Sequence, residues 1–256
     1  MVGGRWVLMG RTGLKGQTRE YIESMFRKLL STVSSAIPSQ CGVCHAWPSD
    51  PVCEACVVRF AQPVPRCQTC ALSVPTGVMR CGECIRQPPP LDACVAAVSY
   101  IYPWAGLIAS YKFNSNPGLA STLATLLRSA PWVEPALDAA DLLLPMPLSR
   151  QRLKARGFNQ ALILARALDS AKTEARALLR IQDTPAQSSL NREERLASVQ
   201  HAFAVDPFLA PKLRGKRIVL IDDVMTSGAS LYAAARTLRA AGAVHITGMV
   251  IARTEH

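Results

Sequence analysis

Lys-Arg-Ile-Val-Leu-Ile-Asp-Asp-Val-Met-Thr-Ser-Gly-Ala-Ser, residues 216–230, is the stretch that decides the fold. Its apolar run over 218–221 is rich in β-branched residues, which is typical of a strand buried on both faces of a parallel sheet. Two acids, Asp222 and Asp223, end this expected strand, and a polar turn and then apolar residues at helical spacing follow. Strand, turn and helix in that order put the turn at the carboxyl edge of the sheet, where open α/β folds bind ligands.

The turn carries the groups that hold a sugar phosphate. A helix start offers unpaired backbone N–H groups and a positive dipole end, which suit a phosphate, and Gly228 lets the backbone approach it closely. The two acids would repel that phosphate, so they suit the neighbouring hydroxyls of a ribose, with a hard cation nearby. The plainer alternative is an Asp cap followed by small residues that start an ordinary helix. Adjacent acids, three hydroxyls and a glycine in register favour the ligand loop.

This loop resembles the phosphoribosyl-pyrophosphate (PRPP) loop of the type I phosphoribosyltransferases. In that pattern an apolar strand, two acids and two variable residues precede Thr-Thr-Gly-Ala-Thr or a close relative. Ser227 and Ser230 stand where threonine is commoner, and both keep the hydroxyl. The resemblance implies that PRPP binds here together with Mg²⁺. The implied PRPP-binding residues are Asp222, Asp223, Thr226, Ser227, Gly228, Ala229 and Ser230.

Length and charge narrow the class of protein. A chain of 256 residues with 49% hydrophobic residues is long enough for one substantial domain and a smaller one. The formal net charge of +11 favours phosphate-bearing partners, either a polyphosphate substrate or nucleic acid, although a basic soluble surface explains it equally. No apolar run approaches the roughly 18 residues of a membrane helix, and the N-terminus shows no export signal. We therefore expect a cytoplasmic protein with no membrane span.

Four successive Cys-x-x-Cys pairs follow the N-terminal region. They are Cys41 and Cys44, Cys53 and Cys56, Cys67 and Cys70, and Cys81 and Cys84. One pair can supply two corners of a tetrahedral zinc site and a second pair completes it, so the eight thiols suit two Cys₄ zinc ribbons. We prefer sequential pairing, first with second and third with fourth, over an interleaved arrangement. So short a segment holds little apolar material, and zinc would supply much of its stability.

Two other uses of these cysteines compete with zinc. Disulfides need an oxidising compartment, for which there is no export signal. A redox Cys-x-x-Cys would be a single pair at a helix start rather than four pairs in series. Cys94 stands outside the pattern, at the start of an apolar strand, and is expected to be a buried thiol.

Prolines 88–90 form a stiff spacer and mark the expected domain boundary. Before it we expect an N-terminal extension over 1–36, partly disordered with a short helix (spacing over 21–37), and a double Cys₄ zinc-ribbon module over 37–87. After it, 91–256 is expected to form the phosphoribosyltransferase-like domain.

Beyond the spacer, strands and helices alternate, which indicates a parallel α/β sheet. Strands are expected over 93–102, 141–146, 177–181, 203–205, 218–221 and 245–251, and helices over 104–113, 118–130, 159–169 and from 231 onward. The predicted fold class is therefore α/β, a parallel-sheet type I phosphoribosyltransferase-like domain preceded by a small cysteine-rich zinc-ribbon domain.

A cationic run follows the strand expected over 141–146. Arg150, Arg152, Lys154 and Arg156 stand at alternate positions after that strand end, so they lie at the same sheet edge as the Asp222 turn. Guanidinium groups there would project towards a bound polyanion. Most charge runs are solvated faces, but this placement favours a functional role.

In combination, residues 38–253 resemble the ComF family of competence proteins, which joins an N-terminal zinc module to a type I phosphoribosyltransferase domain. The resemblance rests on the cysteine pairs, on the Asp222 loop, and on the segments Leu-Pro-Met-Pro-Leu (144–148), Arg-Gly-Phe-Asn-Gln (156–160) and Asp-Thr-Pro-Ala-Gln (183–187). It implies a mobile loop over 182–200 and contacts to phosphate or pyrophosphate near the basic run. The residues proposed for these contacts are Met146, Pro147, Leu148, Ser149, Arg150, Arg152, Lys154, Arg156 and Arg192, and for Arg192 a helix-face charge is an equal alternative.

Three functions remain open on these grounds. An active enzyme would bind PRPP with Mg²⁺, and a nucleophile would displace pyrophosphate from C1 of the ribose, helped mainly by arginine and Mg²⁺ neutralising the leaving group. No convincing general base and no hood that recognises an acceptor is evident, so the catalytic residues and the acceptor are unknown. A purely structural zinc adaptor is another possibility, and the intact Asp222 loop argues against it.

The remaining alternative is a non-catalytic factor that handles single-stranded DNA. The ComF resemblance implies a link to DNA uptake in natural transformation, with DNA-uptake proteins as partners, and the net charge of +11 fits it. An aromatic content of 6% gives no visible platform for stacking single-stranded bases, which weakens this alternative.

Overall fold

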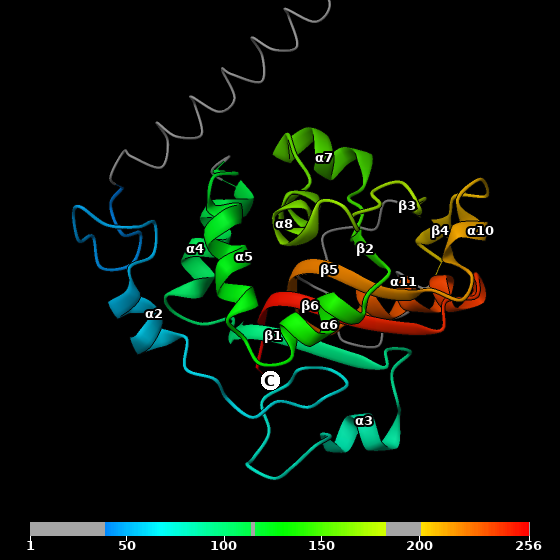
Figure 1. The fold of residues 1–256 in the computed structure, drawn as a ribbon, viewed down its shortest axis with the longest axis horizontal. Coiled ribbons are helices and arrows are strands. Elements are labelled where there is room, and N and C mark those ends of the chain that lie inside the picture. The colour runs from blue at the N-terminus through cyan, green and yellow to red at the C-terminus, as the bar shows by residue number, and fades with distance from the viewer. Residues whose placement is uncertain (1–38, 114–115, 183–200, 256) are drawn as a thin grey trace, which may run out of the picture.

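The protein is built around a four-stranded parallel sheet in the order β1-β6-β5-β2 (Figure 1). It is described from a computed structural model over residues 39–113, 116–182 and 201–255. The strands of this sheet are β1 Ala93–Ser99, β2 Leu142–Pro145, β5 Arg217–Met225 and β6 His245–Arg253. The parallel sheet and its α/β class are those that the sequence predicts.

Helices cover both faces of the sheet (Figure 1). One face carries α4 Trp104–Phe113, α5 Leu119–Arg128, α6 Val133–Ala139 and α8 Gln160–Asp169, and the other carries α11 Ala229–Ala240. The other helices of the described ranges are α2 Glu54–Phe60, α3 Gly82–Arg86, α7 Arg150–Arg156 and α10 Ala210–Leu213. None of the helices in the described ranges has both the length and the apolar character for a bilayer crossing.

Strand β5 divides the core into two layers. Ile218 and Leu220 pack on the α11 side, whereas Val219 and Ile221 pack among α4, α5 and α8. Successive side chains of a strand point to opposite faces, so a continuous apolar run is what a strand buried on both faces requires. Further along β5 this alternation changes, because Val224 packs with the layer of α4, α5 and α8 and Met225 with the layer of α11.

Two expectations about strands are wrong. The strands β3 Leu178–Arg180 and β4 Phe203–Val205 exist, but they pair with each other in a separate antiparallel sheet instead of joining the parallel one. Strand β5 does not end before the acids: it runs through Asp222 and Asp223 to Met225, because β6 pairs with Asp222 and again with Val224 and Met225. Backbone pairing does not depend on side-chain charge, so the strand is longer than the apolar run that predicted it.

Both cysteine segments share the cores of the sheet domain. Cys41 and Cys56 are buried in the layer of α4 and α5, and the Trp104 Nε1 donates a hydrogen bond of 2.9 Å to the carbonyl of Phe60 at the end of α2. Cys67, Cys70 and Cys84 are buried in the layer of α11. The proline spacer at 88–90 therefore separates two stretches of sequence that pack together. The helix expected over 21–37, the mobile loop expected over 182–200 and Arg192 lie outside the described residues.

Candidate functional site

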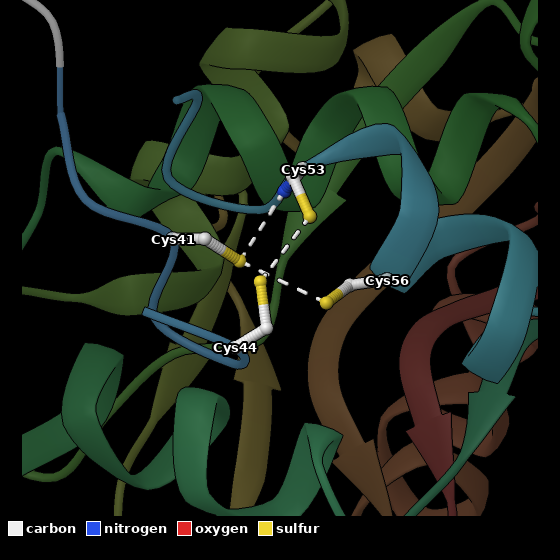
Figure 2. A group of neighbouring side chains, drawn as sticks. All are labelled: Cys41, Cys44, Cys53 and Cys56. Atoms are coloured by element: carbon white, nitrogen blue, oxygen red, sulfur yellow. Dashed lines mark hydrogen bonds between the residues drawn. The ribbon is translucent and has the colours of Figure 1, made fainter. Parts of the chain in front are cut away.

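The eight paired cysteines gather into two groups of four. The first cysteine group is Cys41, Cys44, Cys53 and Cys56, and the second cysteine group is Cys67, Cys70, Cys81 and Cys84. Within each group the sulfur atoms lie within 4.8 Å of one another, and the grouping is the sequential one. Figure 2 shows the four thiols of the first group converging on a common centre.

The spacing of these sulfur atoms fits zinc. Four sulfurs bound at about 2.3 Å to a tetrahedral Zn²⁺ lie about 3.8 Å apart. The sulfurs of Cys41 and Cys56 are 3.9 Å apart, and those of Cys44 and Cys53 are 3.6 Å apart. In the second group the corresponding Cys70–Cys81 distance is 3.7 Å. Both donor sets, four thiols each, could therefore hold a structural zinc ion.

Cys94 is the ninth cysteine and has a different environment. It is 4% exposed, and burial raises the pKa of its thiol to about 12. Its Sγ lies 3.6 Å from the Sδ of Met225. It is the buried thiol that its place in an apolar strand predicts, and it belongs to neither cysteine group.

Residues 226–230, which the sequence predicts to bind a phosphate and which we call the phosphate loop, form a small hollow where β5 meets α11. Together with Asp222 and Leu231 they line a cavity of about 50 Å³. Gly228 has a φ of +80°, and a Cβ on it would lie 2.5 Å from Met225 Cε and 2.6 Å from Tyr232 Cζ. Only glycine fits there. The N-cap residue Gly228 gives no side-chain cap, although the N–H of Ala229 donates to the Oγ of Ser227 at 3.4 Å, and helix-start amides suit a phosphate.

The two acids of β5 have different neighbours. Asp222 lines the hollow of the phosphate loop, beside the first residues of α11. Asp223 is 3% exposed and its Oδ1 lies 2.9 Å from Lys112 Nζ of α4, on the other side. Its Oδ2 has no hydrogen-bond partner among the described residues. A buried carboxylate needs such a counter-charge, so Lys112 is part of the site.

Electrostatics at this edge of the sheet centre on Asp222. Burial, and after it the charge of Asp223, raises the pKa of Asp222 to about 7, while Lys112 and Arg156 act in the opposite direction. Arg156 lies over the ring of Phe113, 5.1 Å from its centroid, at the end of α4. Arg156 and Lys112 are thus the cations that the fold brings to the acids.

The rest of the cationic run is arranged differently from the sequence expectation. It forms α7, and alternate positions of a helix do not share one face, so the four cations cannot all point at one ligand. Arg150 and Lys154 are exposed, and no ion pair within the described ranges involves them. The backbone N–H of Arg152 donates to the Oγ of Ser149, the residue that caps α7.

The residues between β2 and α7 lie at the same carboxyl edge. Met146 is 4% exposed, its side chain is part of the core, and its N–H donates to the carbonyl of Ile221 at 2.8 Å. The carbonyl of Met146 accepts from Asn159 Nδ2 at 3.1 Å, so neither its side chain nor its main chain offers a donor for the expected phosphate contact. Pro147 and Leu148 are half-buried beside it, and Ser149 is buried.

Lys112 was not predicted to be a site residue. The sequence indicated only that it belongs to the helix expected over 104–113. Its partner lies on another element, far along the chain, and no local motif links the two. The one available signal is a lone cation in an otherwise apolar helix that follows a strand of the parallel sheet.

A parallel sheet whose switch from strand to helix carries an acid pair and a glycine-bearing phosphate loop defines a phosphoribosyltransferase-type α/β domain. The model of the phosphoribosyl transferase domain matches residues 153–255. The chain is 30% identical over 178 residues to "Competence protein F" of Haemophilus influenzae, with 66% of this chain and 76% of that protein covered.

Two further relatives agree with this. Identity to "DNA utilization protein YhgH" of Escherichia coli K12 is 28% over 182 residues, covering 67% of this chain and 76% of the relative. Identity to "Competence protein ComFC" of Bacillus subtilis is 41% over 101 residues, covering 40% of this chain and 39% of the relative. The chain belongs to the ComF family of competence proteins.

We expect the purified protein to contain two zinc ions per chain, because each of the two groups supplies a full tetrahedral set. Cys44→Ser should reduce the content to one, measured by elemental analysis. Cys94→Ser, the matched control, should leave both ions, since Cys94 belongs to neither group. A loss of zinc in the Cys94 variant, or none in the Cys44 variant, would contradict the assignment.

Gly228→Ala should destabilise the protein more than Gly157→Ala, as measured by urea denaturation. Both glycines have positive φ, +80° and +79°, so both variants carry backbone strain of roughly 1–2 kcal/mol. Only at Gly228 does the new methyl group also meet Met225 and Tyr232, whereas nothing lies within 4 Å at Gly157. Equal losses at both positions would show that the phosphate loop is not sterically closed at Gly228.

Proposed function

We propose that this protein binds PRPP, with Mg²⁺, at the junction of β5 and α11, and transfers its phosphoribosyl group to an acceptor. The observation that carries this proposal is the hollow formed by Asp222 and residues 226–230. Within it, one carboxylate and a row of helix-start amides lie side by side. These are the two kinds of group that a ribose 5-phosphate needs.

Each end of the ligand has a natural place in the hollow. The amides of the phosphate loop, with the hydroxyls of Thr226 and Ser230, would hold the 5-phosphate. The carboxylate of Asp222 would accept hydrogen bonds from the ribose hydroxyls. The geometry favours Asp222 for this direct contact and gives Asp223, paired with Lys112 at 2.9 Å, the task of holding α4 against β5.

The pyrophosphate would face the cations at the same edge. Lys112 and Arg156 lie close enough to Asp222 to affect its pKa, and Arg156 is supported by the ring of Phe113. Mg²⁺ takes oxygen ligands from carboxylates and phosphates. Asp222 is a half-buried carboxylate that lines the hollow, and it would supply one such ligand. When bound, the ion would neutralise charge on the pyrophosphate as its bond to C1 breaks.

A test of this proposal is the thermal shift produced by PRPP with Mg²⁺. The wild-type protein should be stabilised, by about 2.7 kcal/mol at a ligand concentration a hundredfold above the dissociation constant. Asp222→Asn should abolish the shift because it removes the acceptor for the ribose hydroxyls. Asp138→Asn, an exposed acid on α6, is the matched control and should keep the full shift. An undiminished shift in the Asp222 variant would refute the site.

The pH dependence of thermal stability tests whether the Asp222→Asn variant is folded. Because the folded-state pKa of Asp222 is raised to about 7 from 3.8, its contribution to stability is present below pH 4 and is lost as the pH rises through 7. Without ligand, Asp222→Asn should therefore melt at a higher temperature than the wild type at pH 8 and at a similar one at pH 4. Lost binding by a protein that is more stable cannot be put down to unfolding.

Single-stranded DNA is a second candidate ligand, favoured by the exposed cations of α7 and by relatives named for DNA utilization. Affinity should fall steeply with salt, and Arg150→Ala with Lys154→Ala should reduce the slope by about 0.7 for each phosphate that is no longer neutralised. Lys212→Ala with Arg236→Ala removes the same charge from exposed positions elsewhere and should leave the slope nearly unchanged. If both double substitutions reduce the slope equally, the loss of net charge explains the reduction, and α7 is excluded as the DNA-binding surface.

A further inference from the structure

Arg253 lies between the second cysteine group and the phosphate loop. It is the last residue of β6 and is only 4% exposed. Its Nε donates to the carbonyl of Cys70 at 3.0 Å. Its Nη1 donates to the carbonyl of Met225 at 3.1 Å and also to that of Thr226. Through these hydrogen bonds the guanidinium group links Cys70, of the second cysteine group, to Met225 and Thr226, where β5 leads into the phosphate loop.

The surrounding side chains reinforce this connection. Cys70, Cys84, Met225 and Tyr232 belong to one buried cluster. Met225 contacts the Sγ of Cys94, and both Met225 and Tyr232 close the space around Gly228. The second cysteine group therefore lies directly behind the phosphate loop, whereas the first lies behind α4.

The chemistry of these hydrogen bonds indicates the structural role of Arg253. Buried carbonyl groups at the end of a strand need hydrogen-bond donors. Here the donor is the planar guanidinium fork of Arg253, whose N–H groups point in fixed directions. Cys70 contributes its carbonyl to that fork and its sulfur to the cysteine group. A shift of Cys70 that accompanies a change in the cysteine group would thus also move the carbonyl that accepts from Arg253.

We propose that Arg253 is a positioning residue that couples the second cysteine group to the phosphate loop, so that the loop keeps its binding geometry only when that group is metal-loaded. The identity of the ligand rests on the function proposed above. The order of the loop does not, because it can be measured without ligand.

Arg66 provides a matched control. It is another mostly buried arginine of the same cysteine segment, with its side chain 11% exposed. It donates to the carbonyl of Ala71 and the Oγ of Ser99, both at 3.0 Å, and pairs with Glu255 at 3.2 Å. Within the described residues none of these bonds reaches 225–230. Arg66→Lys therefore disturbs the docking of the segment without touching the loop.

The experiment compares backbone hydrogen exchange over residues 226–231 in the zinc-loaded full-length protein. Arg253→Lys keeps the charge but loses the fork, and it should speed exchange there by about tenfold, the effect of one lost charge-assisted hydrogen bond. Arg66→Lys should leave exchange in this segment unchanged. Unchanged exchange in the Arg253 variant, or equal acceleration in both, would overturn the coupling.

A second pair of variants tests the role of the metal, and applies also if Arg253→Lys does not fold. Cys81→Ser removes one sulfur from the second group and Cys44→Ser one from the first. Only the Cys81 variant should exchange faster over 226–231. Equal acceleration in both variants would overturn the proposal.

PRPP binding, measured by calorimetry with Mg²⁺, separates the two proposals. If wild type binds and Arg253→Lys binds about tenfold more weakly than Arg66→Lys, both stand. If wild type binds and the two variants bind equally, the positioning role fails and the proposed function stands. If wild type does not bind PRPP but loop exchange responds as expected, the proposed function fails and the coupling stands.

Discussion

The backbone ladder between β5 and β6 is the interaction on which the rest of the structure depends. It continues past the apolar run to the pair Met225–Arg253, so it carries both acids into the sheet. Asp222 then lines the hollow beside the first residues of α11, and Asp223 pairs with Lys112 of α4. The same ladder brings Arg253 beside the turn that leads to the phosphate loop. A strand ending at Ile221 would leave all three side chains without fixed directions.

The two cysteine groups act on this ladder from opposite layers. The first is buried with α4, the helix that supplies Lys112 to Asp223. The second is buried with α11 and bonds to Arg253 through the Cys70 carbonyl. Zinc sites stabilise small segments by fixing thiols in space, and here each such segment is part of a larger core. The cysteine-rich region is therefore part of the two cores that border the candidate site, and each of its cysteine groups could hold zinc.

Charge is distributed in keeping with a phosphorylated sugar as ligand. The net charge is +11, yet the centre of the site is a pair of carboxylates. One is offset by Lys112, and the other is costly to ionise, because burial and its neighbour raise its pKa. Cations and helix-start amides surround this pair at the carboxyl edge of the sheet. Hydroxyl groups for the acids and phosphates for the cations would satisfy both at once.

The sequence alone determined the features that depend on neighbouring residues. The β-branched run from Ile218 predicted a strand buried on both faces, the residues after it predicted a glycine-bearing turn and then a helix, and the cysteine spacing predicted two groups of four. Each depends on periodicity, backbone freedom or ligand spacing, which are local properties. Only the tertiary structure decided that Lys112 pairs with Asp223, that Arg253 joins Cys70 to the phosphate loop, and that β3 pairs with β4 outside the main sheet. These contacts join residues that are distant in the chain, and packing of the two cores around β5, not local sequence, determines which of them meet.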